Sequence, residues 1–192
     1  MNTRLFAAIA AAAIFSAQAA PAAQALKTAV FAGGCFWSAQ HDIEHTPGVV
    51  KVAVGYAGGT RPGPNYENHE GYLESIQVTY DPAKISYPKL VDAFFHHIDP
   101  TDPDGQICDR GPTYRTAVFA ADPAERQAAE QVKAQIGKEL RHSIATEIRP
   151  AARFWMGEDY HQDYARKNPG AYNAYRVGCG RDATLRVVWG GR

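Results

Sequence analysis

The most informative segment of this chain of 192 residues is TAVFAGGCFW, residues 28–37. Residues 28–32 form a short apolar run, and two glycines follow it at 33 and 34. This pattern predicts a buried strand followed by a turn. Residues 36–45 contain neither glycine nor proline, so a helix is expected to begin just after Cys35. The stretch therefore predicts a strand, a turn and a helix with a cysteine at their junction.

Further strands and helices follow from the hydrophobic pattern. Apolar runs bounded by turn signals indicate strands at 49–56, 74–80, 114–120 and 146–150. Helical spacing and start signals indicate helices at 87–97, 122–141 and 158–167. Long polar loops are expected at 57–71 and 99–112, and a mostly irregular tail at 171–192. This mixture of strands and helices predicts an α/β or α+β fold.

The composition bounds the kind of protein. Lysine and arginine number 20, as do aspartate and glutamate, so the zero formal net charge argues against a dedicated nucleic-acid binder. With 45% hydrophobic residues the chain is typical of a globular domain, and its length fits one domain, which we expect to be a monomer. Three cysteines are too few for a disulfide-stapled scaffold, and an odd number leaves one unpaired or reactive.

Residues 1–25 have the layout of a secretory signal peptide. Arg4 precedes an apolar run at 5–15, and two A-x-A patterns follow, the second ending at Ala25. The apolar run is shorter than the roughly 20 residues of a membrane-spanning helix, so we expect no stable membrane anchor. Cleavage would leave a domain at 26–192 in the periplasm or outside the cell, where thiols tend to become oxidised.

Cys35 is a candidate nucleophile because of its expected place at the start of a helix. The free N–H groups and partial positive charge of a helix N-terminus stabilise a thiolate, the reactive form of cysteine. Phe36 and Trp37 would border the thiol with aromatic surface. The plainer alternative is a buried structural cysteine, since a free cysteine often packs as a small hydrophobe. The strand, the two glycines and the helix start together favour the nucleophile.

From Cys35 outward the sequence resembles the peptide methionine sulfoxide reductase A family, the reductases of the S epimer of methionine sulfoxide. The resemblance includes the signature GCFW at 34–37 and runs in order from Thr28 to Gly170. The other blocks that carry it are VGYAGG at 54–59, NY at 65–66, GYLESI at 71–76, YDP at 80–82, DPT at 99–101, DRGPTYRT at 109–116, TEI at 146–148, FW at 154–155, EDYHQDY at 158–164 and KNP at 167–169. Ordered blocks are more specific than the signature alone.

The resemblance implies a two-layer α/β (α+β) sandwich, with a mixed sheet flanked by helices and a long C-terminal coil. It implies reduction of free and protein-bound methionine S-sulfoxide, and hence repair of oxidised proteins. Neither a metal nor an organic cofactor is implied, because an external thioredoxin-like dithiol supplies the reducing equivalents. For an exported chain that partner would be a periplasmic thioredoxin-like protein.

The resemblance also implies roles for individual residues. Cys35 would attack the sulfoxide sulfur and become a sulfenic acid. Glu74 would protonate or hydrogen-bond the sulfoxide oxygen, since a carboxylic acid with a raised pKa can donate a proton near neutral pH. The hydroxyl groups of Tyr66 and Tyr114 would bind the same oxygen, and Asp109 would support the site. The implied substrate-binding residues are Phe36 and Trp37, which would hold the methyl group, and more distantly His161 and Tyr164.

The resolving cysteine, the thiol that attacks the sulfenic acid, is where the chain departs from the family pattern. Relatives often carry it near the position of Asn173, whereas this chain offers Cys179 or Cys108. The glycines beside Cys179 suit a mobile tail that swings to the nucleophile, which favours Cys179. Cys108 adjoins Asp109 and is the alternative.

Two other classes of protein remain open on residue chemistry alone. The first is an acyl transferase or hydrolase in which His161 activates Cys35, and it would need neither Glu74 nor a resolving cysteine. The second is a non-catalytic domain that binds methionine-rich or oxidised segments through Phe36 and Trp37. It would keep its binding when Cys35 is replaced by serine.

Overall fold

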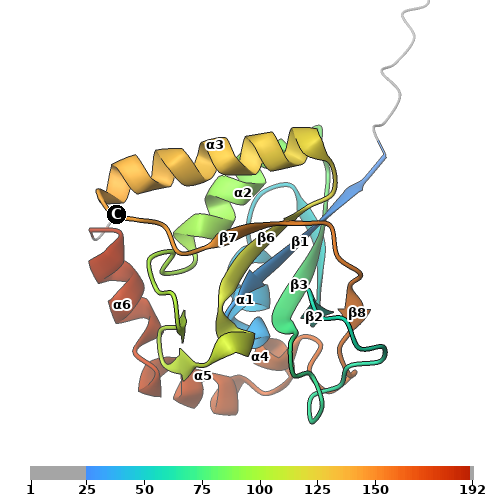
Figure 1. Ribbon diagram of the computed structural model, residues 1–192. Coiled ribbons are helices and arrows are strands. Elements are labelled where there is room, and N and C mark those ends of the chain that lie inside the picture. Colours follow the sequence, from blue (N-terminus) through green and yellow to red (C-terminus); the bar gives the residue numbers. More distant parts are fainter. Residues whose placement is uncertain (1–24, 191–192) are drawn as a thin grey trace, which may run out of the picture.

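The structure, a computed structural model, describes residues 25–190 and is built on one mixed sheet (Figure 1). The strands of this sheet are β1 (Lys27–Gly33), β2 (Val49–Ala57), β3 (Leu73–Tyr80), β6 (Thr116–Ala120), β7 (Glu147–Pro150) and β8 (Trp155–Met156). They run in the order β7-β6-β1-β3-β2-β8, and neighbours are antiparallel except for the parallel pair β6 and β7. The sheet is therefore mixed, as expected.

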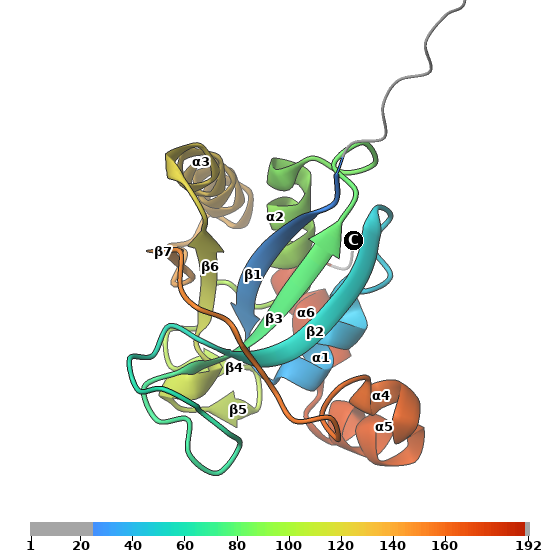
Figure 2. The ribbon, with the colours of Figure 1, turned by 90° about the vertical axis from the view of Figure 1, so that its right-hand side faces the viewer.

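Helices cover one face of the sheet. The helices are α1 (Phe36–Ile43), α2 (Tyr87–His96), α3 (Pro123–Leu140), α4 (Tyr164–Lys167), α5 (Pro169–Gly178) and α6 (Arg181–Val188). Phe31 of β1 is fully buried and stacks on Phe94 of α2, with ring centroids 4.7 Å apart. In Figure 2, α1 and α2 lie behind the strands, and the chain that leaves β7 crosses in front of them. The two-layer prediction is confirmed.

The expected strands and most expected helices form close to their predicted bounds, but the helix expected at 158–167 is largely absent. Only α4 forms within it, because Asp163 has a left-handed backbone with φ +55° and interrupts the helix. The Gln162 side chain instead hydrogen-bonds both Val54 N–H and Val54 C=O, each at 2.9 Å, and so completes the edge of β2. These partners on β2 are remote in sequence.

The C-terminal tail is helical, and the prediction of irregular coil at 171–192 is wrong for its described part. The red helices α5 and α6 of Figure 1 join at Gly180, whose φ of +67° makes the turn. Arg176 of α5 and Arg181 of α6 both donate to the Asp42 carboxylate, at 2.8 and 2.9 Å. Trp189 Nε1–H donates to the carbonyl of Ile98 at 3.0 Å. These contacts with residues distant in the sequence stabilise the two helices, which the glycine-rich local sequence does not indicate.

Replacing Arg181 by alanine is expected to destabilise the protein by about 2–4 kcal/mol. Its guanidinium is buried and donates to Asp42 and to the His97 carbonyl. Without it, these two acceptors would lose a hydrogen-bond donor. Urea denaturation would measure the change, with the exposed Arg186→Ala on the same helix as control, expected within about 0.5 kcal/mol of wild type. Equal midpoints for the two variants would contradict the anchoring role of Arg181.

The signal-peptide prediction for 1–25 lies outside the described residues, except for Ala25. Within residues 25–190, no helix is both long enough and apolar enough to cross a membrane. The domain prediction of 26–192 therefore remains a prediction.

Candidate active site

Cys35 lies at the junction that the sequence predicts, between β1 and α1. Gly34 makes the turn with φ +77°, and a side chain there would collide with Gln106, so only glycine suits the position. Cys35 is the N-terminal cap residue of α1 and is a free thiol with 7% of its surface exposed. Strand, turn and helix thus place the thiol at the surface of the core, with little access to water.

Glu74 of β3 lies under this helix start. It is 2% exposed, and its Oε2 accepts the Phe36 backbone N–H at 2.9 Å, one of the N–H groups that a helix cannot satisfy internally. Burial raises the pKa of the Glu74 carboxyl to about 8. At neutral pH the group is consequently a neutral acid that can donate a proton.

The surroundings of Cys35 oppose the thiolate that the helix start was expected to favour. Burial, and then the nearby Glu74, raises the pKa of the thiol to about 12. A hydrogen bond with Tyr175 and one from the Trp37 backbone N–H act in the opposite direction but are smaller. The first N–H of α1 is also committed to Glu74. Burial therefore favours the protonated thiol in this enclosed position.

Tyr66, Tyr114 and Asp109 reach the site from three separate segments. Tyr66 lies in the 58–72 loop, Tyr114 in the 3₁₀ turn η1 (Pro112–Tyr114), and Asp109 in the short strand β5 (Asp109–Arg110). Burial, and then the carboxyl of Glu74, raises the pKa of both tyrosines. Asp109 in turn contributes to the raised pKa of Cys35. The fold thus gathers all three predicted residues around the thiol and Glu74.

Trp37 forms the aromatic wall of the site. Its ring stacks on Tyr164 with centroids 3.8 Å apart and an interplanar angle of 8°. Its Nε1–H donates to His161 Nδ1 at 3.0 Å. Phe36 is 1% exposed and packs against His161 with centroids 5.0 Å apart, so it supports the wall from the core side.

His161 is not placed to act as a base for Cys35. Because Nδ1 accepts the indole proton, the ring proton lies on Nε2, which is buried without a hydrogen-bond partner among the described residues. Burial also lowers the pKa of His161, which keeps the ring neutral. This geometry gives no support to the hydrolase alternative.

The two candidate resolving cysteines are bonded to each other. Cys108 occupies the turn between β4 (Gly105–Gln106) and β5, and forms a disulfide with Cys179, the last residue of the α5 turn, with Cα atoms 5.2 Å apart. The carboxylate of Asp109 and the two sulfur atoms all lie within 4.8 Å of one another. Cys108 is exposed, so the disulfide is accessible. Which thiol attacks first stays a prediction.

Two functional neighbours were not singled out from the sequence. Tyr175 of α5 donates its hydroxyl proton to Asp109 Oδ2 at 2.5 Å, and its ring meets the Trp37 ring edge-on. Glu158 accepts the Tyr66 N–H at 2.8 Å and so holds the loop that carries Tyr66. A helix at 169–178 would place Tyr175 one turn before Cys179, but the tail was expected to be irregular.

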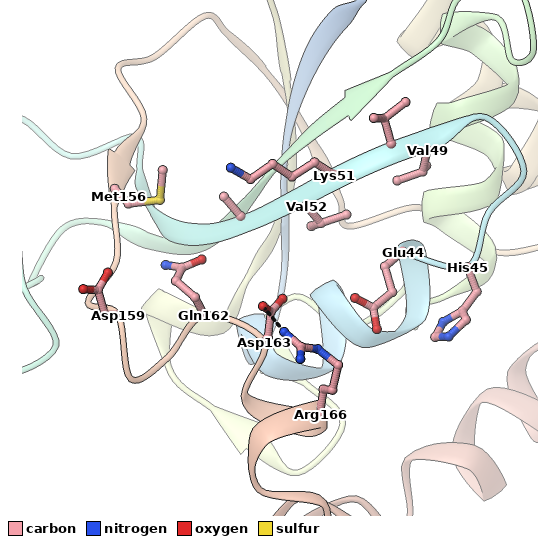
Figure 3. Close-up of a pocket in the computed structure, with 12 residues that line it drawn as sticks. Glu44, His45, Val49, Lys51, Val52, Met156, Asp159, Gln162, Asp163 and Arg166 are labelled. Atoms are coloured by element: carbon pink, nitrogen blue, oxygen red, sulfur yellow. Dashed lines mark hydrogen bonds and ion pairs between the residues drawn. The ribbon is translucent and has the colours of Figure 1, made fainter.

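A separate groove follows the open edge of β2 and faces the 156–166 segment (Figure 3). Its volume is about 760 Å³, and the Asp163–Arg166 ion pair, 2.7 Å long, lies at its side. None of the predicted site residues lines it. The candidate active site is therefore around Cys35, not in this groove.

A free thiol, a neutral carboxylic acid and an accessible disulfide meet within one small region, which points to oxidation and reduction at sulfur. The class of protein is thus a thiol-dependent oxidoreductase. The chain belongs to the peptide methionine sulfoxide reductase family, whose family model matches residues 27–192.

Named relatives agree with this assignment. The chain is 49% identical over 175 residues to peptide methionine sulfoxide reductase MsrA 2 of Caulobacter vibrioides, covering 88% of this chain and 89% of the relative. Methionine sulfoxide reductase A of Corynebacterium diphtheriae is a similar solved structure, with a TM-score of 0.70, 33% identity, and coverage of 75% of this chain and 76% of the other. Mxr1 of Saccharomyces cerevisiae in complex with Trx2 matches with a TM-score of 0.54, 27% identity, and coverage of 79% and 91%. The chain is a methionine sulfoxide reductase A enzyme.

Proposed function

We propose that this enzyme reduces the S epimer of methionine sulfoxide, free and in proteins, through a sulfenic acid on Cys35. The observation that carries the proposal is the buried Glu74 carboxylic acid, hydrogen-bonded to the first N–H of the helix that bears Cys35. An acid and a nucleophile held on one helix start can act together on one sulfoxide.

In the first step the Cys35 sulfur attacks the sulfoxide sulfur while Glu74 gives its proton to the sulfoxide oxygen. Tyr66 and Tyr114 supply hydroxyl donors to that oxygen as negative charge develops on it. The attack forms a bond between the two sulfur atoms. The substrate sulfur–oxygen bond and this sulfur–sulfur bond then both break as the oxygen is transferred to Cys35, which leaves a sulfenic acid and releases methionine. The thiol proton restores Glu74, so that protons balance.

In the second step Cys179 or Cys108 attacks the sulfenic sulfur, which releases water and forms a disulfide with Cys35. The remaining thiol of the pair then attacks this disulfide, which frees Cys35 and closes Cys108–Cys179. A free Cys35 beside a closed Cys108–Cys179 bond fits the enzyme after one substrate has been reduced. An external dithiol would then reopen the bond.

The external dithiol is proposed to be a thioredoxin-like protein. A related enzyme, Mxr1, is known in complex with Trx2, and the accessible position of Cys108 suits attack by a protein thiol. Because the sequence at 1–25 has the layout of a signal peptide, the donor is placed in the periplasm. Cell fractionation that finds the chain only in the cytoplasm would contradict this location.

Replacing Cys108 or Cys179 by serine is expected to stop thioredoxin-supported turnover after about one methionine per enzyme, because the sulfenic acid or its first disulfide can no longer pass to the exchangeable pair. Methionine formed from the separated S epimer would be counted with thioredoxin and, in parallel, with excess dithiothreitol. The small thiol should keep both variants active. Asn173→Ala, an exposed change on α5, is the control that should turn over like wild type. Continued thioredoxin turnover by both serine variants would contradict the relay.

A further inference from the structure

The strongest feature not used by the proposed chemistry is the placement of Tyr175. Its hydroxyl donates to Asp109 Oδ2 at 2.5 Å, and its ring lies against Trp37, which is two residues after Cys35. Asp109 lies within 4.8 Å of both sulfur atoms of the Cys108–Cys179 disulfide. A continuous set of contacts therefore runs from the disulfide through Asp109 and Tyr175 to Trp37, beside the nucleophile.

Tyr175 stands where a substrate would have to be. Its ring meets the Trp37 ring edge-on, with centroids 6.1 Å apart, on the side chain proposed to receive the substrate methyl group. A sulfoxide sulfur must come within about 3–3.5 Å of the Cys35 sulfur to react. The thiol is only 7% exposed, and the Tyr175 hydroxyl is near enough to influence its pKa. Substrate and Tyr175 compete for the same space.

The disulfide helps to hold Tyr175 in this place. Tyr175 and Cys179 are four residues apart at the end of α5, and the N–H of Cys179 donates to the Tyr175 carbonyl at 2.8 Å. The Cys108–Cys179 bond ties this end of α5 to the turn that precedes Asp109. A movement of Cys179 toward Cys35 would therefore move the end of α5 that carries Tyr175.

We propose that Tyr175 is a further active-site residue, which covers Cys35 while the Cys108–Cys179 disulfide is closed and withdraws when the disulfide is reduced. Sulfoxide then enters only an enzyme whose resolving thiols are ready. This inference rests on the proposed function, since it takes Cys35 as the nucleophile and Cys108–Cys179 as the last disulfide. The arrangement prevents Cys35 from being oxidised when no thiol is free to resolve the sulfenic acid, which could otherwise proceed to an irreversible sulfinic acid.

Alkylation of Cys35 by iodoacetamide tests the cover directly, with the Cys35 peptide quantified by mass spectrometry. In the disulfide-closed wild type we expect slow labelling. Tyr175→Ala in the same state is expected to label at least about tenfold faster, since its ring no longer blocks approach. Tyr175→Phe keeps the ring and should label within about threefold of wild type. Val177→Ala, an exposed change on the same helix, is the control for helix substitution.

A second arm leaves Tyr175 unchanged and opens the disulfide. The double variant Cys108→Ser with Cys179→Ser should label about as fast as disulfide-closed Tyr175→Ala, and adding Tyr175→Ala to it should change little. Equal labelling of wild type and Tyr175→Ala with the disulfide closed would overturn the proposal, as would equal labelling of the wild type and the double serine variant. The same samples are assayed for S-sulfoxide reduction with dithiothreitol, so an inactive wild type refutes the proposed function separately.

Discussion

Replacing Cys35 by serine is expected to lower the rate of methionine-S-sulfoxide reduction by roughly a thousandfold or more, because the oxygen has no sulfur to accept it. A serine hydroxyl is not a soft nucleophile toward sulfur and cannot form a sulfenic acid. The measurement is methionine released from each separated sulfoxide epimer with excess dithiothreitol, which bypasses the need for a protein reductant.

The control for this loss is the pair of single variants Cys108→Ser and Cys179→Ser under the same conditions. They should retain most of the activity, because dithiothreitol can attack the sulfenic acid on Cys35 directly. If Cys35→Ser reduces the S epimer at the wild-type rate, Cys35 is not the nucleophile. Absence of reduction by the wild type would refute the whole chemical scheme.

Replacing Glu74 by glutamine is expected to lower kcat by about 10²–10⁴-fold, the range for removing a general acid. Glutamine keeps an oxygen to accept the Phe36 N–H but has no proton to give at the sulfoxide oxygen. Because the pKa of Glu74 is raised to about 8, wild-type activity should fall as the pH rises through that value. The variant should lack this alkaline fall, which a pH series of initial rates would measure. A fall of equal size in both proteins would assign it to another group.

The pH dependence of protein stability is a control for the effect of Glu74→Gln on activity. Its pKa is raised in the folded protein from an ordinary value of 4.5 to about 8, so between these values the folded state holds a proton that the unfolded state has lost. Stability from this group is full below pH about 4.5 and is lost as the pH rises through about 8. The difference in stability between Glu74→Gln and wild type should therefore change in favour of the variant between pH 4 and pH 9. Thermal denaturation of both proteins at the two pH values would measure this change. If Glu74→Gln loses activity but remains as stable as wild type, the loss of activity reflects catalysis and not folding.

Local patterns predicted the central part of the fold well. The apolar run into Gly33 and Gly34, followed by a segment without glycine or proline, leads to β1, the turn and α1 as expected. Start signals such as Asp122 before Pro123 act locally too, since the Asp122 side chain accepts the Glu125 N–H at 2.8 Å. Such elements are predictable because the residues that stabilise their backbone are neighbours in the sequence.

The C-terminal region was less predictable because its contacts are remote. Arg181 is buried only because Asp42, 139 residues earlier, accepts its guanidinium. Arg176 of α5 donates to the same carboxylate, and α5 brings Tyr175 to Asp109 and Cys179 to Cys108. A sequence rich in glycine gives no local sign of these partners.

The family and the nucleophile candidate could be predicted from the amino-acid sequence, because ordered motifs and a cysteine at a strand-to-helix junction are local features. The other site residues followed only from the resemblance to the family. The pairing of Cys108 with Cys179, the contact of Tyr175 with Asp109 and the raised pKa of Cys35 are visible only in the folded chain. The physical reason is that pairing, access and pKa depend on distance and burial. Those quantities exist only after β3, the 105–114 segment and α5 have been brought around the start of α1.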